Sequence, residues 1–229
     1  MLCSRVGCTQ KAYPEYWAKL QILRGIIWQT TPTGDHAENL QKAKDAFLDA
    51  LQVFTLQAYP FEGAWVQSTL GNVWLNLRSG DIEQSQRNAI KAFKAALTVF
   101  TQETYPVYYG SSQYGLGNAW RGRAFLPWGG QDDFAINAYQ EALKVYTRQS
   151  NPAYWAEMQM YLASRVTLDK SDKEKSCNSM KQVIMRIRAV EKLNLTTGWK
   201  DWWVKYIRSQ WIEFLCGNDA SFDAIPPLE

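Results

Sequence analysis

The chain has 229 residues, of which 46% are hydrophobic and 21% charged, an ordinary composition for a folded protein. No run of about 18 apolar residues occurs, so we expect no membrane-spanning helix. Residues 1–8 also lack the apolar stretch of a signal peptide, and we therefore expect a cytoplasmic protein.

Residues 1–13 precede the first unit of a repeating pattern. Thr9 lies 46 residues before Thr55, so residues 5–13 resemble the tail of a helix whose first half is missing. Either an array once extended further upstream, or this short segment caps the first unit. If it covers that unit incompletely, two chains could associate through the N-terminal repeat, at a face containing Trp17, Ile22 and Ile26.

A proline recurs every 46 residues along the chain, at Pro14, Pro60, Pro106 and Pro152. Other positions keep the same period, and these columns hold glutamine (Gln21, Gln67, Gln113, Gln159), glycine (Gly25, Gly71, Gly117) and tryptophan (Trp28, Trp74, Trp120). A fixed period of this size is typical of a solenoid, in which each unit buries its apolar face against the next. The pattern predicts four repeats, at residues 14–59, 60–105, 106–151 and 152–197.

The second repeat shows the helix pair that we expect in each unit. Pro60 suits the first turn of a helix, and apolar residues then recur at helical spacing over 65–77. Gly80 permits a left-handed turn, and Asp81 can cap the next helix. Small and aromatic residues follow at steps of three and four: Ala89, Ala92, Phe93, Ala96, Leu97 and Phe100.

The third repeat differs from its neighbours in the turn between its helices. Residues 124–131 contain Phe125 and Trp128, where the other repeats are polar. An exposed aromatic loop can mark a binding site, which makes Trp128 a candidate contact. Alternatively, Trp128 folds back onto the first turn of its own second helix, and both interpretations remain open.

The last part of the chain is expected to close the array. The fourth repeat is degenerate, as terminal repeats commonly are. We interpret residues 198–217 as a capping helix and residues 218–229 as a flexible tail. The capping helix is indicated by an apolar stripe at steps of four: Trp199, Trp203, Ile207, Trp211 and Leu215.

The motifs of these repeats carry a family resemblance. A leucine–glycine pair lies in the first helix, an alanine–aromatic–alanine triplet in the second, and a proline closes the unit: Leu70-Gly71, Leu116-Gly117, Ala89/Phe93/Ala96, Ala135/Tyr139/Ala142, Pro106 and Pro152. Over residues 9–197 the chain resembles tetratricopeptide repeat proteins, although its period exceeds their usual 34 residues or so. It is similar to the long-repeat subtype of filamentous bacteria such as cyanobacteria, which is often found beside CHAT protease domains.

The resemblance implies an all-α fold, a right-handed α-solenoid of four helix hairpins, which the C-terminal capping helix would close. It also implies an interaction scaffold or adaptor that binds a peptide or an extended protein segment. The alternative that it implies is a regulatory or sensor subunit of a separately encoded protease or signalling effector.

The resemblance further suggests where a partner would bind. First helices line the concave groove of tetratricopeptide arrays, and an asparagine there can hold a peptide backbone or a terminal carboxylate. The matching positions in this chain are Asn72 and Asn118. The other side chains expected on this groove are Trp65, Tyr114, Asn76 and Arg121. Alternatively, the two asparagines only bridge adjacent first helices.

Positive charge concentrates near the end of the chain, although the net charge is only +3. Residues 165–208 contain eleven Lys or Arg and five Asp or Glu. A patch there could attract an acidic partner: Lys181, Arg186, Arg188 and Lys192. Nucleic-acid binding is the weaker alternative, because the patch is small and no RNA-binding motif accompanies it. A solvated helix face is the plainest interpretation.

Catalytic and metal-binding patterns are missing from the sequence. The only histidine, His36, follows Gly34 and Asp35 at a predicted helix start. The cysteines lack paired spacing, so we expect reduced thiols and no zinc site: Cys3, Cys8, Cys177 and Cys216. We therefore expect a protein that is not an enzyme and needs no cofactor.

Overall fold

The computed structural model describes residues 9–77, 80–124, 132–164 and 173–191, and every regular element within these ranges is an α-helix. The expected all-α class is therefore confirmed for the part of the chain that is described. The helices are α2 (Pro14–Thr30), α3 (His36–Leu51), α4 (Pro60–Asn76), α5 (Ile82–Ala96), α6 (Pro106–Ala124), α7 (Asp132–Ala142), α8 (Pro152–Ser164) and α9 (Lys173–Glu191). None of them has the length and hydropathy that a bilayer span requires.

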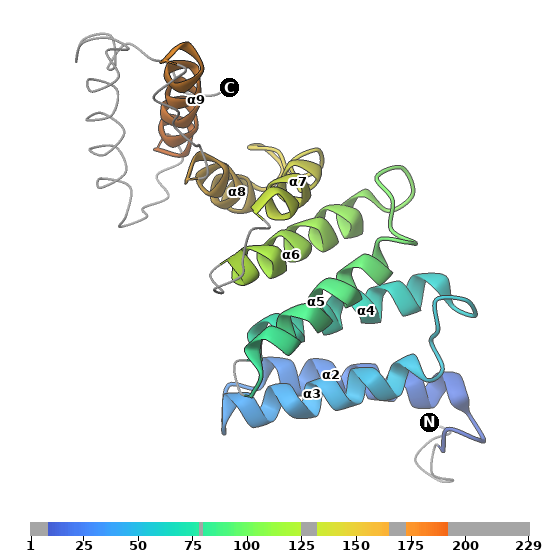
Figure 1. The fold of residues 1–229 in the computed structure, drawn as a ribbon. Helices are drawn as coiled ribbons and strands as arrows, with labels where there is room; N and C mark the ends of the chain where they lie inside the picture. Colours follow the sequence, from blue (N-terminus) through green and yellow to red (C-terminus); the bar gives the residue numbers. More distant parts are fainter. Residues whose placement is uncertain (1–8, 78–79, 125–131, 165–172, 192–229) are drawn as a thin grey trace. The chain divides into compact units, whose positions relative to one another are not determined.

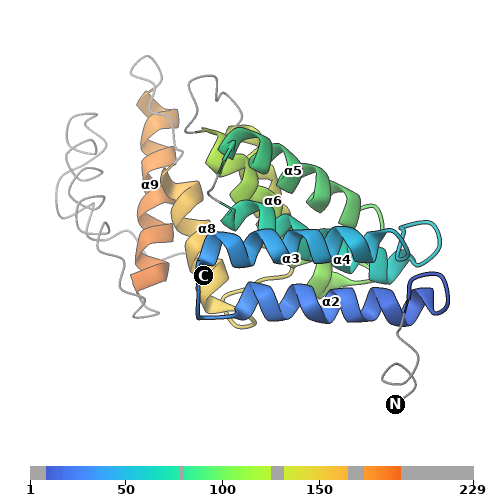
Figure 2. The ribbon, with the colours of Figure 1, turned by 90° about the horizontal axis from the view of Figure 1, so that it is seen from below.

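The chain separates into two compact units, Met1–Val145 and Tyr146–Glu229. In the first unit the helices pair in chain order, α2 with α3, α4 with α5 and α6 with α7 (Figure 1). Figure 2 shows α2 and α3 side by side along their length. Contacts of α3 with α4 and of α5 with α6 join successive pairs, and in the second unit α8 packs against α9. Such nearest-neighbour packing is consistent with a helical repeat.

The first helix of each pair begins at the recurring proline, as predicted. A threonine four residues before the Tyr or Asn that precedes this proline organises the turn leading into the helix. At Thr55, the hydroxyl accepts a hydrogen bond from the Ala58 N–H at 3.1 Å, and the carbonyl accepts one from Tyr59 at 2.9 Å. Thr9 forms the same two contacts before α2, at 3.3 and 3.0 Å. The chain therefore enters α2 through the type of turn that joins one pair to the next.

The turn inside each of the first two pairs also follows the prediction. Gly34 and Gly80 have φ values of 83° and 86°, in the left-handed region that glycine tolerates. The carboxylates of Asp35 and Asp81 each accept a hydrogen bond at 2.9 Å from the backbone N–H three residues later. These side chains satisfy donors that the first turn of a helix leaves unpaired.

Helix α5 ends at Ala96, one turn earlier than the apolar pattern predicts. The backbone then tightens, because Thr98 and Val99 donate to carbonyls three residues before them, at 3.3 and 3.1 Å. Phe100 is nevertheless fully buried. Apolar spacing therefore located the core residues correctly but not the end of the helix.

In the first three pairs a buried aromatic ring from the second helix lies against the glycine of the first helix. The three contacts are Gly25 with Phe47, Gly71 with Phe93 and Gly117 with Tyr139. A Cβ on Gly71 would lie 2.8 Å from the Phe93 ring, closer than packed carbon atoms approach one another. A residue larger than glycine at these positions would displace the aromatic ring, which explains why glycine recurs there.

Lysines cover the tryptophans of the repeating column. Lys42 lies 4.5 Å from the centre of the Trp28 ring, and Lys44 lies 5.4 Å from that of Trp74. These distances fall within the range of cation–π attraction. The tryptophans pack against the core while a face of each ring remains accessible to a neighbouring cation.

Two expectations about individual residues are wrong. Ile22 and Ile26 pack against the core formed by α3 and α4 and do not belong to an exposed terminal face. Cys177 is disulfide-bonded, which contradicts the expectation of reduced thiols at this position. Spacing along the sequence shows which cysteines are neighbours in the chain but not which thiols meet in the fold.

Candidate functional site

Asn72 and Asn118 occupy the same position on α4 and α6. Each follows a glycine against which a buried ring packs, so the core fixes the backbone at both positions. The first helices α4 and α6 are in direct contact, and the hydroxyls of Ser68 and Ser112 lie 3.0 Å apart between them. Both asparagines are half-buried. The predicted column is therefore present on two neighbouring helices.

The side chain of Asn118 is occupied by a contact inside its own helix pair. Its Oδ1 accepts a hydrogen bond of 2.6 Å from the hydroxyl of Tyr139, a fully buried residue of α7. A buried hydroxyl needs such an acceptor, because desolvation without a partner is costly. For Asn118 the structure therefore favours a role in packing over the groove contact.

The side chain of Asn72 has a different environment. The residue that corresponds to Tyr139 in this pair is Phe93, which has no hydroxyl to offer. Among the described residues no hydrogen bond to the Asn72 side-chain amide is found, although its backbone carbonyl accepts one from Asn76 Nδ2 at 2.9 Å. A half-buried amide of this kind can both donate to and accept from an extended backbone.

The remaining groove candidates divide into packed and exposed side chains. Trp65 is half-buried and packs against the cores on both sides of α4, so its ring contributes mainly to stability. Tyr114 is half-buried with its ring centre 6.1 Å from that of Tyr139. Arg121 is half-buried near the end of α6, and Asn76 is exposed at the end of α4. The predicted Trp128 contact lies outside the described residues.

The predicted basic patch does not form one exposed surface. Arg186 turns inward on α9 and donates a hydrogen bond to Oε1 of Gln159, a buried residue of α8. Burial lowers the pKa of the Arg186 guanidinium below its ordinary value. Lys181 is exposed and Arg188 is half-buried, whereas Lys192 lies beyond the described residues.

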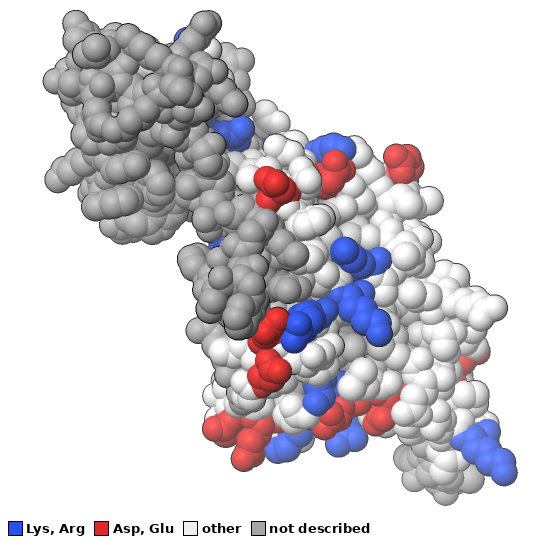
Figure 3. Space-filling model, in the orientation of Figure 1, with Lys and Arg blue, Asp and Glu red and all other residues white. Residues whose placement is uncertain are grey.

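The surface charge of the described residues is mixed on the face that Figure 3 shows. Basic side chains gather near the middle of this face, and acidic side chains lie along its lower edge and near its upper end. Nucleic acids are bound by surfaces on which lysine and arginine dominate. This face therefore does not resemble a nucleic-acid interface.

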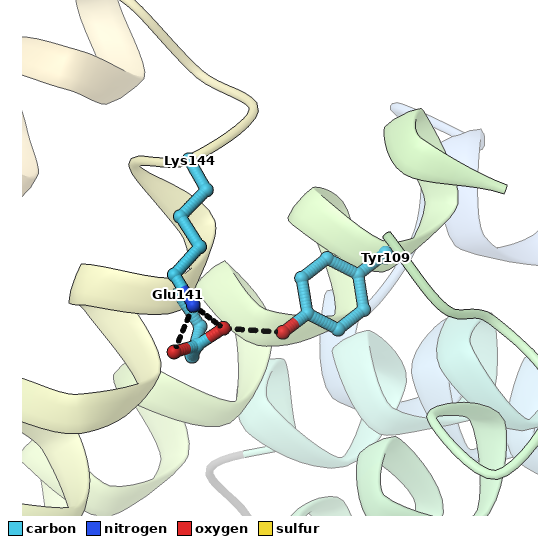
Figure 4. A network of polar contacts seen from close by, with 3 residues as sticks. All are labelled: Tyr109, Glu141 and Lys144. Atoms are coloured by element: carbon cyan, nitrogen blue, oxygen red, sulfur yellow. Dashed lines mark hydrogen bonds and ion pairs between the residues drawn. The ribbon is translucent and has the colours of Figure 1, made fainter. Parts of the chain in front are cut away.

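A polar network that the sequence did not indicate joins α6 to the end of α7 (Figure 4). The Tyr109 hydroxyl donates to Glu141 Oε2 at 2.6 Å, and Lys144 Nζ lies 2.6 and 2.7 Å from the two carboxylate oxygens. The hydrogen bonds from Lys144 and Tyr109 lower the pKa of Glu141. Burial, followed by the bond to Glu141, raises the pKa of Tyr109. The i, i+3 spacing of Glu141 and Lys144 permits an ion pair, but no feature of the sequence places Tyr109 beside them.

No protein-family model matches the chain, and neither curated proteins nor solved structures include a significant match.

The site supports recognition of a polar backbone by side-chain amides. Among the described residues, no group of three or more His, Cys, Asp or Glu side chains lies close enough together to hold a metal ion. The Tyr109 network bridges two helices and leaves its carboxylate fully engaged, so we assign it a structural role. Asn72 is the half-buried candidate whose side-chain amide has no hydrogen-bond partner among the described residues, and the exposed Asn76 lies one turn further along α4.

Proposed function

We propose that this chain is a non-enzymatic scaffold or adaptor of the tetratricopeptide type. Its four helix pairs would form a right-handed α-solenoid closed by a capping helix at residues 198–217. A peptide or extended protein segment would bind along the first helices, beside Asn72. The packing of helix pairs in chain order supports the architecture, and the side chains on α4 support the binding site.

One observation carries the binding proposal. Asn72 presents an amide without a hydrogen-bond partner among the described residues, at a position where the neighbouring pair ties its asparagine to Tyr139. An amide that has no structural partner is available to a ligand, and a main-chain amide of the ligand offers complementary donors and acceptors. The hydrogen bond from Tyr139 explains the asparagine at position 118, but no such bond explains the one at position 72.

The proposal is tested by affinity purification from native lysate with three proteins. The wild-type chain, Asn72→Ala and Asn137→Ala are compared by quantitative mass spectrometry. Asn137 is an exposed asparagine on the second helix α7, so it controls for the loss of an amide elsewhere. We expect one protein to be depleted with Asn72→Ala alone, while all three chains melt at the same temperature. Equal recovery from all three would contradict the proposed site.

The other two functions lack such support. Nucleic-acid binding would need an exposed basic patch, but Arg186 binds Gln159 inside its own unit. A regulatory role beside a separately encoded effector rests on the family resemblance alone.

A further inference from the structure

The outer face of α2 carries a continuous stripe of exposed apolar side chains. Its members are separated by four, three and four residues, the a/d spacing at which one helix packs along another. The stripe consists of Tyr16 (62% exposed), Leu20 (45%), Leu23 (55%) and Ile27 (62%). Contiguous apolar surface of this kind marks a site of interaction more often than scattered apolar residues do.

The corresponding face of the next first helix shows what such a surface accepts. Val66 and Val73 lie on α4 at the positions of Leu20 and Ile27, and both are fully buried. They belong to one core cluster with Leu40 and Phe47 of the preceding helix α3. The positions of Leu20 and Ile27 therefore receive a helix in the next pair, and on α2 both are exposed. The positions of Tyr16 and Leu23 correspond to the polar residues Glu62 and Thr69 of α4, so the full apolar stripe is particular to α2.

The charges around the α2 stripe differ from those of the buried faces. By helical geometry Lys19 and Arg24 border the stripe on its two sides, and both are exposed. Arg24 replaces the leucine that α4 carries at Leu70, which is buried. Neither cation has an ion-pair partner among the described residues, and Glu15, the only acidic residue of α2, accepts a hydrogen bond from Tyr59. The stripe therefore favours a helix with acidic borders.

A second copy of the chain does not meet this requirement. If two α2 helices packed through their stripes in parallel, Lys19 of one would face Arg24 of the other. In the antiparallel arrangement Lys19 would face Lys19, and Arg24 would face Arg24. Both orientations bring like charges together at the positions that set partner choice in helix pairs.

Residues 1–8 are also a poor match for the stripe. They carry Arg5 and no acidic residue, so they cannot neutralise Lys19 or Arg24.

We propose that the outer face of α2 binds an amphipathic helix of another protein, whose apolar a/d stripe is bordered by Asp and Glu. The apolar side chains would supply most of the buried area, and the acidic borders would select the partner through Lys19 and Arg24. This surface lies on α2 and Asn72 lies on α4, so the two binding proposals can be tested independently of each other.

Two synthetic peptides test the proposal with the full chain. Both have three heptads with leucine at a and d; the acidic probe has glutamate at every e and g, and the basic probe has lysine there. Fluorescence anisotropy of the labelled peptides measures binding at physiological salt. We expect the acidic probe to bind at least about tenfold more tightly than the basic probe, because the latter meets like charges.

Three variants locate the binding surface. Leu20→Ser with Leu23→Ser should weaken the acidic probe at least about tenfold, and both side chains are exposed enough for the fold to tolerate the change. Lys19→Glu with Arg24→Glu should reverse the preference towards the basic probe. Leu48→Ser removes a leucine of similar exposure (43%) from α3 and should leave both affinities unchanged.

Five results would overturn the proposal. These are binding of neither probe, equal binding of both, and a preference that the charge reversal does not alter. The fourth is binding that appears only after residues 1–8 are removed, which would identify that segment as the occupant. A wild-type dimer in light scattering that Leu20→Ser with Leu23→Ser dissociates would instead identify a second copy.

Discussion

At the scale of single residues, one hydroxyl separates the two asparagines of the column. Tyr139 donates to Asn118, whereas Phe93 at the corresponding position cannot donate to Asn72. The asparagine therefore has a packing role in the pair of α6 and α7, whereas in the pair of α4 and α5 its side-chain amide has no such partner. The repeat pattern showed the column but not this difference, because the hydrogen bond crosses from α6 to α7.

The stability of the two asparagine variants should differ accordingly. Asn118→Ala removes the acceptor of a buried hydroxyl and should lower the free energy of unfolding by about 1–3 kcal/mol. Asn72→Ala should change it by less than about 0.5 kcal/mol. Urea denaturation measures both values. Adding Tyr139→Phe to Asn118→Ala should recover part of the loss, and a failure to recover any would contradict the assigned bond.

The network of Tyr109, Glu141 and Lys144 should make stability depend on pH at both extremes. The pKa of Glu141 is lowered in the folded state, so its contribution is present above the ordinary carboxyl pKa of about 4.3. That contribution is lost as the pH falls through the folded value. The pKa of Tyr109 is raised, so its contribution is present below about pH 10 and is lost as the pH rises further.

The free energy of unfolding, measured as a function of pH, tests both the loss of stability at low pH and the loss at high pH. Wild type should be more stable than Glu141→Gln at pH 7, and the difference should shrink below about pH 4. Tyr109→Phe should reduce the loss of stability above pH 10. A difference between wild type and Glu141→Gln that persists unchanged at pH 3 would show that the carboxylate charge is not responsible.

At the scale of helices, a ring packs closely against a glycine in each of the first three pairs. Proline and glycine positions predicted the starts of α2, α4, α6 and α8 and the turns at Gly34 and Gly80, because these residues act on the local backbone. The exposed face of α2 was predicted at Trp17, Ile22 and Ile26. The structure instead places Ile22 and Ile26 against the core, because apolar residues occur on both sides of this helix. Periodicity alone cannot show which of two apolar faces is buried.

Substitution of Gly71 tests the packing of a pair. Alanine improves helix propensity by up to about 1 kcal/mol, but its Cβ would lie 2.8 Å from the Phe93 ring. Overpacking of this kind costs about 1–3 kcal/mol, so we expect Gly71→Ala to be destabilising. In a double-mutant cycle, Phe93→Leu should be less harmful in the Gly71→Ala background than in wild type. Additive effects would contradict the contact.

At the scale of the whole molecule, the chain presents repeated helix pairs whose individual members have diverged. The period of 46 residues predicted where pairs would form, since each helix contacts mainly its neighbours in the chain. The inward position of Arg186 and the disulfide at Cys177 could not be predicted, because they depend on which helices meet in space. The number of repeats and the handedness of the array remain predictions. For the described residues, the scaffold interpretation rests on surfaces that the packing leaves exposed.

The most direct test of the scaffold interpretation uses the partner recovered by affinity purification. The quantity measured is the affinity of its binding segment for the chain. Isothermal titration calorimetry compares wild type, Asn72→Ala and Asn137→Ala, with melting temperatures measured on the same samples. The account predicts that Asn72→Ala weakens binding by about tenfold, or roughly 1.4 kcal/mol, while Asn137→Ala binds like wild type and all three melt alike. Equal affinity of all three chains would contradict it.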